Sequence, residues 1–297
     1  MTGRLVDTLV LLMTAGMALP SLADEWPPIE KSEVFSAHRR HVLVIEPDAA
    51  EEPRPGHCQA TLFKLEDGKR TQVWSRCLIN DDGPVRVFVA DSGDYVLTMD
   101  EWGQVGTLPV VIYGPRGDLI RVHNLDSLGL DDDILKIRQT LSSSWWNEDS
   151  ISFFGADEER FFIRLHWGKW IVLELARGDV FKRLKKADFF RDDLYEEHKK
   201  KWNELKEYRQ KELEAQAIAR LTSESARERA AGALVCGQEK FAKAVPGLKA
   251  LLTDEESYRT NQPKEWTRVY PVRKAAKEAL EAMGEKAEGV VIEEPDE

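Results

Sequence analysis

The sequence predicts a multidomain α+β protein with an antiparallel all-β domain, a long linking helix and a short helical solenoid. Three observations lead to this prediction. Short apolar runs separated by turn residues fill 58–177, which is typical of small antiparallel strands. A charged segment at 178–222 has apolar residues every three or four positions, as an amphipathic helix does. Two similar helical stretches then lie 46 residues apart within 223–284.

The first 23 residues have the composition of a removable export signal. Arg4 supplies a positive charge, Thr8–Leu19 an apolar run, and Ser21, Leu22 and Ala23 a cleavage site. The apolar run is shorter than the roughly 20 residues that a bilayer-spanning helix needs, so a membrane anchor is the less favoured alternative. We therefore expect an exported protein, periplasmic or extracellular, without a membrane span in its mature chain.

An acidic, Pro-rich leader at 24–57 contains one predicted strand, Arg40–Glu46, and precedes the β domain. Within 58–177 the strands are interrupted by one short predicted helix at Asp132–Leu141. The predicted strands are Cys58–Leu65, Gln72–Ile79, Val85–Ala90, Tyr95–Asp100, Leu108–Tyr113, Leu119–His123, Ile151–Phe154, Arg160–Trp167 and Trp170–Ala176. Their number suits a sandwich or a set of small sheets.

Within this domain, residues 91–121 resemble one blade of a β-propeller. The resemblance rests on the runs Asp91-Ser-Gly-Asp-Tyr-Val-Leu-Thr and Val110-Val-Ile-Tyr-Gly-Pro-Arg-Gly-Asp-Leu-Ile-Arg. It implies four-stranded antiparallel sheets, but the strands present are too few for the four blades that a closed propeller typically needs. We therefore expect a twisted sandwich or an open stack of blade-like sheets.

Two of the three cysteines flank a predicted hairpin whose turn is Asp67-Gly68. Counting outward from a two-residue turn sets Cys58 opposite Cys77, which favours a cross-strand disulfide. The same count makes them a hydrogen-bonded pair, in which side chains lie farther apart than at the alternate sites, unless a bulge intervenes. Two buried thiols are the equally weighted alternative. Cys236, on a predicted packed helix, is expected to be a small core residue.

The C-terminal third contains the helices that suggest a solenoid. Ala226-Arg-Glu-Arg-Ala-Ala-Gly-Ala-Leu aligns with Val272-Arg-Lys-Ala-Ala-Lys-Glu-Ala-Leu, and Ala244-Val-Pro-Gly-Leu-Lys-Ala-Leu-Leu supplies a partner helix between them. The pattern resembles the short HEAT-like repeats of the phycobilisome-lyase type over 223–284. This resemblance implies stacked helix pairs that offer a binding face. The acidic tail at 285–297 is expected to be disordered.

The charge and the motifs narrow the classes of function. The net charge of −11 makes nucleic acid an unfavoured partner, because an acidic surface repels phosphate. The linking helix is basic but alternates in sign, which favours a solvated helix over one bound to an anionic surface. None of the common nucleophile, phosphate-binding, metalloprotease or haem-attachment motifs is present, so an enzyme is the less favoured alternative and no cofactor is expected.

Several polar clusters have simpler explanations than catalysis or metal binding. His38 and His41 flank two arginines without an evident third ligand, which favours a basic surface patch over a metal site. Asp131–Asp133 precede a predicted helix, where carboxylates favour the positive end of the helix dipole. For the pair Trp145 and Trp146 we favour a core anchor over a sugar-binding platform.

The long insertion Asp254–Tyr270 between the helices is the best candidate for a binding site. Insertions in solenoids gather on one face, often the binding face. The alternative is that the aromatic side chains of this insertion fold back and cap the short helical stack. Aromatic and Arg residues of this kind are enriched at interface hot spots. The candidate residues are Tyr258, Arg259, Trp266, Arg268 and Tyr270.

We therefore expect a non-catalytic, exported interaction or scaffold protein whose partner is another protein. The alternative is an extracytoplasmic carbohydrate-active or carbohydrate-binding protein with its site on the β domain. That alternative predicts a deep cleft with two convergent carboxylates, or a solvent-facing ring among Trp102, Trp145, Trp146 and Trp167. A subunit that is ordered only within a larger assembly is a third possibility.

Overall fold

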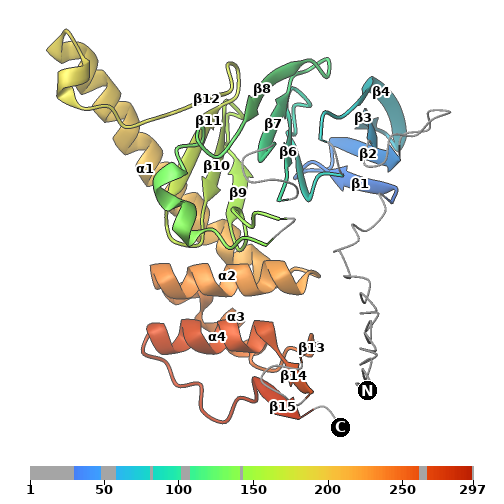
Figure 1. Ribbon diagram of the computed structural model, residues 1–297, viewed down its shortest axis with the longest axis vertical. Helices are drawn as coiled ribbons and strands as arrows, with labels where there is room; N and C mark the ends of the chain where they lie inside the picture. The colour runs from blue at the N-terminus through green and yellow to red at the C-terminus, as the bar shows by residue number, and fades with distance from the viewer. Residues whose placement is uncertain are drawn as a thin grey trace, which may run out of the picture.

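The computed structural model describes residues 30–47, 58–80, 83–101, 108–140, 143–260 and 266–295. Three four-stranded antiparallel sheets precede a segment of four helices, which also carries a small three-stranded sheet (Figure 1). The predicted α+β organisation and the blade-like sheets are confirmed at this level. The predicted export signal lies outside the described residues.

Each of the three larger sheets uses four consecutive strands in chain order, as a propeller blade does. We call them the first, second and third sheet. The first contains β1 (Ser32–Phe35), β2 (His41–Pro47), β3 (Cys58–Glu66) and β4 (Lys69–Cys77); the second contains β5 (Arg86–Val89), β6 (Val96–Met99), β7 (Val110–Tyr113) and β8 (Leu119–His123); the third contains β9 (Ile151–Phe154), β10 (Arg160–Arg164), β11 (Trp170–Glu174) and β12 (Asp179–Val180).

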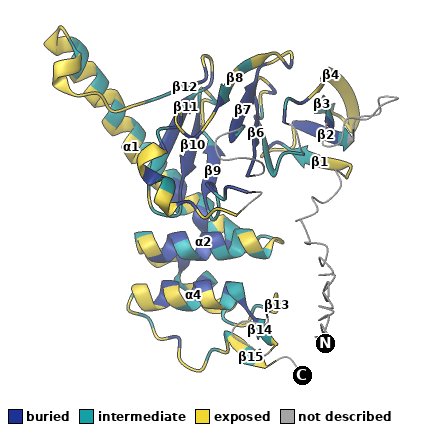
Figure 2. Cartoon of the chain, in the orientation of Figure 1, coloured by how far each residue is buried: buried dark blue, intermediate teal, exposed yellow. Residues whose placement is uncertain are grey.

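The sheets are held together by apolar cores that each pair of neighbours shares. Trp74 and Tyr113 belong to the core between the first and second sheets. Alternation along β10 sends Phe161 into the core shared with the second sheet and Phe162 into the core shared with the helices. The third sheet is therefore covered on both faces. In Figure 2 most strands of these sheets are buried.

A predicted helix between the second and third sheets is shorter than expected and has 3₁₀ geometry, over Asp131–Lys136. Its acidic first turn is the one that the sequence indicated. Asp133 is buried and accepts hydrogen bonds from Lys136 (2.7 Å) and Lys169 (2.5 Å). These two bonds hold the pKa of Asp133 below its usual value although burial opposes this.

The linking helix starts later than the sequence predicts. Helix α1 spans Asp192–Arg220, whereas residues 179–191 form β12, a 3₁₀ turn at Lys186–Asp188 and extended chain. Val180 pairs with Leu173 of β11, so this segment completes the third sheet instead of extending the helix. Asp192 and Asp193 then begin α1, where carboxylates favour the positive end of the dipole.

The remaining helices lie where the sequence predicts them, at Ala226–Glu239 (α2), Val245–Leu251 (α3) and Pro271–Ala282 (α4). Ser225 caps α2 by accepting a hydrogen bond from the backbone N–H of Glu228 (3.4 Å). Helices α2 and α4, the two similar stretches, pack side by side (Figure 1). None of the described helices combines the length and the apolar composition needed to cross a bilayer.

The acidic tail contributes a strand, so the expectation of disorder over 285–297 is wrong for its described part. Strand β15 (Glu293–Pro295) pairs with β14 (Thr267–Val269), which in turn pairs with β13 (Tyr258–Thr260). Ala287 is also buried. The tail is ordered here because β14 of the inserted loop pairs with β15.

The cysteine register differs from the predicted one by a residue. Cys77 lies opposite Gln59 and donates its thiol to the Oε1 atom of that side chain (3.1 Å). A bulge between Leu62 and Phe63 shifts the count. Because neighbouring residues point to opposite faces of a strand, Cys58 faces the core and Cys77 faces solvent. Cys58 and Cys77 are therefore not opposite each other, and the cross-strand geometry on which the predicted disulfide depended is absent.

The close approach of α2 and α4 depends on Gly237. A Cβ at this position would lie 2.5 Å from the Cα of Ala279, a distance that forces the helices apart. We expect Gly237→Ala to lower the free energy of unfolding by about 1–3 kcal/mol, measured by urea denaturation. Gly247→Ala is the matched control, because its Cβ would meet only the flexible end of Leu221 at 2.8 Å. Equal losses in the two variants would contradict this account.

Candidate functional site

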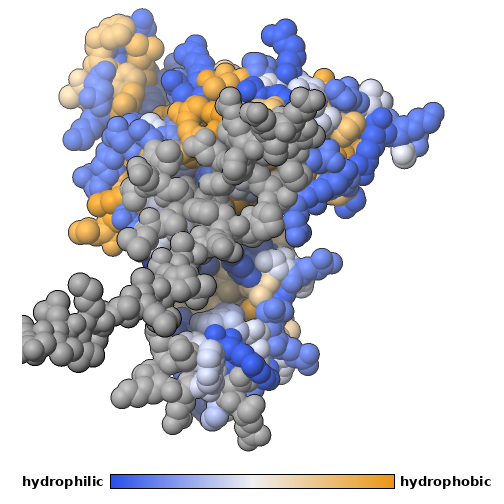
Figure 3. Space-filling view, turned by 45° about the vertical axis from the view of Figure 1, so that its right-hand side comes forward, coloured by the Kyte–Doolittle hydropathy of each residue, from blue (hydrophilic) through white to orange (hydrophobic). Residues whose placement is uncertain are grey.

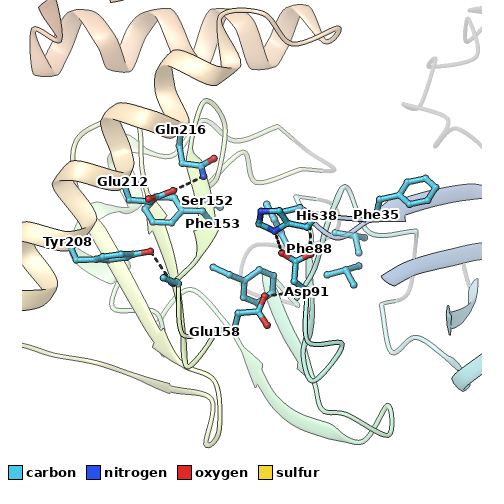
Figure 4. A pocket seen from close by; sticks show the side chains of 16 residues that line it. Phe35, His38, Phe88, Asp91, Ser152, Phe153, Glu158, Tyr208, Glu212 and Gln216 are labelled. Atoms are coloured by element: carbon cyan, nitrogen blue, oxygen red, sulfur yellow. Dashed lines mark hydrogen bonds and ion pairs between the residues drawn. The ribbon is translucent and has the colours of Figure 1, made fainter. Parts of the chain in front are cut away.

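Strands from all three larger sheets meet around one cleft of about 430 Å³. They are β1, β5 and β9, the first strand of each sheet, together with the loops that follow them (Figure 4). Helix α1 supplies the remaining wall. Each of these three strands is an edge strand of its sheet.

The apolar walls of the cleft are anchored in the cores behind them. Phe88 and Phe154 each pack edge-on against Phe161, with ring centroids 4.9 and 5.0 Å apart. Phe153 stacks on Phe162 at 5.4 Å. These contacts fix the rings on the β5 and β9 sides, so the cleft is preformed.

A chain of hydrogen bonds joins the loops at the rim. His38 Nδ1 lies 2.5 Å from Asp91 Oδ2, and the backbone N–H of His38 donates to the other carboxylate oxygen (2.8 Å). Glu158 in turn accepts the backbone N–H groups of Asp91 (2.6 Å) and Ser92 (2.9 Å). The first sheet is thereby fastened to the second, and the second to the third.

The third sheet is fastened to the helix by the next bond in this chain. The hydroxyl of Tyr208 on α1 accepts the backbone N–H of Ala156 (2.9 Å). Burial and the charge of Glu212 raise the pKa of Tyr208, which keeps the phenol neutral. One turn farther along α1, Gln216 donates to Glu212 (2.9 Å), as Figure 4 shows.

The histidine cluster is a basic surface patch in part, because His38, Arg39 and Arg40 are exposed whereas His41 is buried. His41 is buried, and its Nδ1 lies 2.9 Å from the backbone oxygen of Asp91. The ring fits only because residue 93 is glycine: a Cβ there would lie 2.5 Å from His41 Nε2, at a backbone φ of +78°. His38 is exposed but held by Asp91, so both rings position the second sheet's first loop.

The carboxylates of the cleft, Asp91, Glu158 and Glu212, accept hydrogen bonds from other groups of the protein. Burial opposes ionisation of Asp91, but the hydrogen bonds from the His38 ring and backbone hold its pKa below the usual value. A glycosidase pair needs one carboxyl group whose pKa is raised, so that it can donate a proton. Asp91 has the opposite property. Among the described residues no cluster suits a metal ion.

The tryptophans of the carbohydrate alternative lie outside this cleft. Trp146 is 1% exposed and its indole N–H donates to the backbone oxygen of Asp100 (2.8 Å), which confirms a core anchor. Trp145 is half-buried beneath the guanidinium of Arg138 at 4.5 Å. Trp167 is half-buried, and Trp102 lies outside the described residues.

The predicted partner-binding residues lie on the small sheet beside α4. Tyr258 and Trp266 are exposed, at 55% and 59%, whereas Tyr270 is buried. Arg259 and Arg268 are register partners, so their side chains share one face of the sheet. Trp266 lies directly before β14. Tyr258 belongs to the opposite face.

Tyr270 holds the small sheet against the helical segment. Its hydroxyl donates to Glu294 of β15 (2.5 Å), and the guanidinium of Arg273 lies 3.7 Å from its ring centroid. Glu294 also approaches Arg268 at 3.9 Å. The capping role considered for the loop therefore applies to Tyr270, while Trp266 remains available at the surface.

Sequence reasoning missed the cleft and the strand β15. The cleft residues come from positions far apart in the chain, and no motif links them. A usable signal was the Gly93 position in Asp91-Ser-Gly-Asp, which marks a tight turn after a strand. The opposing charges of Arg268 and Glu294 could have suggested the pairing of the tail.

Glu158 should contribute measurably to stability through its two backbone N–H partners. In Glu158→Gln the amide nitrogen cannot accept a hydrogen bond, so one partner loses its acceptor, and we expect a loss of about 1–2 kcal/mol in unfolding free energy. Amide hydrogen exchange at Asp91 and Ser92 should accelerate. The neighbouring Glu159→Gln is the control, since that side chain is 70% exposed. An unchanged exchange rate in Glu158→Gln would contradict the fastening role.

Asp91 should make stability depend on pH in the acid range. A carboxyl group whose folded pKa is lowered adds stability above its unfolded pKa of about 3.9, and loses it as the pH falls through the folded pKa. Asp91→Asn removes this contribution. The difference in unfolding free energy between the two proteins should be largest near pH 5 and shrink below pH of about 4. A difference that grows on acidification would show the opposite sign and exclude this role.

Two solved structures match this chain only distantly. A putative 6-phosphogluconolactonase from Bacteroides fragilis matches 50% of this chain and 36% of its own, with 11% identity and a TM-score of 0.29. This chain therefore spans about a third of that protein. A structure of HIRA residues 644–1017 matches 87% of this chain and 93% of its own, with 12% identity and a TM-score of 0.29. No protein-family model and no curated protein matches the chain.

Proposed function

We propose that this chain is a non-catalytic interaction or scaffold protein that binds another protein through the sheet β13–β14–β15. The observation that supports this most is the exposure of Trp266 (59%) and Tyr258 (55%) on one short hairpin. Large aromatic side chains lose little entropy when they are covered and dominate interface energies. Arg259 and Arg268 on the same sheet add the residue type that most often accompanies them.

The contacts that hold the hairpin against α4 support recognition by a preformed surface. The Tyr270 hydroxyl ties Glu294 of β15 to the start of α4, and Arg273 of α4 covers the Tyr270 ring. A surface that is ordered before binding loses less conformational entropy on association. The side-by-side packing of α2 and α4 supports a HEAT-like stack as the platform. Export to the periplasm or beyond, by the signal at 1–23, is part of the same proposal.

Replacing Trp266 tests this function directly. In affinity capture with the full chain as bait, Trp266→Ala should retain the partner at least about tenfold less, because it removes a buried anchor of the complex. The thermal midpoint should stay within about 2 °C of the original, since the ring is exposed in the free protein. Leu135→Ala, 97% exposed on the β domain, is the control and should capture normally.

The capping alternative gives the reverse pattern. If Trp266 stabilises the end of the helical stack, Trp266→Ala will melt several degrees lower while the captured partner is unchanged. That result would overturn the proposed interface.

A further inference from the structure

The segment between β12 and α1 carries a second exposed surface, independent of the small sheet. We call residues 181–191 the arm tip. Its sequence is Phe-Lys-Arg-Leu-Lys-Lys-Ala-Asp-Phe-Phe-Arg, with five basic residues and one acidic residue. Phe190 is 88% exposed and Leu184 is 42% exposed. In Figure 3 apolar and hydrophilic side chains lie next to each other at this end of the molecule.

The arm tip is ordered, and its aromatic side chains divide into two that pack on α1 and one that is exposed. Phe181 stacks on Trp202 of α1 with ring centroids 5.7 Å apart, and Phe189 packs against His198 at 5.3 Å. The same histidine accepts the backbone N–H of Leu184 (3.1 Å). Two apolar rings therefore secure the tip to the helix. Phe190, which immediately follows Phe189, points the other way.

Hydrogen bonds within the tip fix its backbone, and one of them is accepted by its single acidic side chain. Asp188 accepts the backbone N–H of Lys185 (2.6 Å). Lys186 pairs with Asp192 (3.3 Å), and Arg191 pairs with Asp193. Over 143–260, where the chain is described without a gap, no carboxylate pairs with Lys182, Arg183 or Lys185. Three cations consequently remain available beside the two exposed apolar side chains.

The arm carries this basic tip away from the acidic body. Lys201 pairs with Glu174 of β11 (3.6 Å), and residues 192–200 of α1 extend beyond that contact. At 1.5 Å per residue this extension is about 13 Å, longer than the Debye length of about 8 Å in physiological salt. Figure 1 shows the arm projecting past the sheets. Screening thus weakens the effect of the net charge of −11 at the far end of the tip, where Leu184 contacts His198. Phe181, at the start of the tip, still donates its backbone N–H to Val172 of β11 (2.7 Å).

We propose that the arm tip binds the surface of an anionic phospholipid bilayer. Lys182, Arg183 and Lys185 would contact lipid phosphates, each contributing about 1 kcal/mol near such a surface. Phe190 and Leu184 would enter the boundary between headgroups and acyl chains, where an aromatic ring gains apolar contact without crossing the membrane. An acidic polymer would satisfy the cations but would leave the projecting Phe190 and Leu184 in water. The pairing of both chemistries in one ordered tip favours lipid.

Vesicle sedimentation with the full chain tests the proposal. The protein should bind vesicles of phosphatidylcholine containing about 30% phosphatidylserine, and should bind pure phosphatidylcholine much more weakly. Raising the salt concentration should release it, because screening weakens the attraction. Phe190→Ser should lower the affinity about tenfold, as expected for removing one buried aromatic side chain. Lys182→Gln combined with Arg183→Gln and Lys185→Gln should abolish the preference for anionic vesicles.

Leu135→Ser is the matched control, since it removes an apolar side chain that is 97% exposed outside the arm. It should bind vesicles as the original chain does, and circular dichroism should be the same for every variant. Equal binding by Phe190→Ser and the original chain would overturn the proposal. So would equal binding to both kinds of vesicle, or binding to a single-stranded oligonucleotide without binding to anionic vesicles.

Discussion

Three four-stranded sheets stand side by side here without closing into a ring, so each presents an edge strand to the same space. An exposed edge is a site where strands from other chains can pair. The rim bonds from His38 to Asp91, from Asp91 to Glu158 and from Ala156 to Tyr208 fix the order of the sheets and end at α1. This chain of bonds forms the rim of the cleft and connects the three sheets to α1.

Helix α1 then serves two purposes along its length. Its second half buries Leu213 and Ala217 against the third sheet and the other helices, and it closes the cleft with Tyr208 and Glu212. Its first nine residues, 192–200, extend beyond the contact of Lys201 with Glu174 of β11 and carry the arm tip. A helix that has an apolar stripe over only part of its length is stable as a whole, because helical hydrogen bonding propagates from the packed part.

The sequence predicts what depends on local pattern and misses what depends on distant polar contacts. Alternating apolar residues predicted the strand Ile151–Phe154 with its observed bounds, and the start of α2 follows from Ser225 and Glu228. In contrast, His38 and Asp91 are 53 positions apart, and a single bond of this kind has no periodicity. The bulge between Leu62 and Phe63 could not be predicted from local pattern either. Its extra residue places Gln59, and not Cys58, opposite Cys77.

A partly buried group of charges joins the sheets to the helical segment. Glu228 of α2 pairs with Arg220 (2.9 Å) and Arg86 (3.4 Å), and burial lowers the pKa of Arg220 to about 10 despite that carboxylate. Arg227 reaches the buried Glu101 of the second sheet at 2.7 Å.

Such a junction has little tolerance for rotation, because moving either partner would leave a buried charge without a counterion. The small sheet, carried by α4, and the arm tip, carried by α1, are therefore held in fixed positions at opposite ends of the molecule (Figure 1). The two surfaces proposed above, one for a protein partner and one for lipid, therefore lie apart on the same chain.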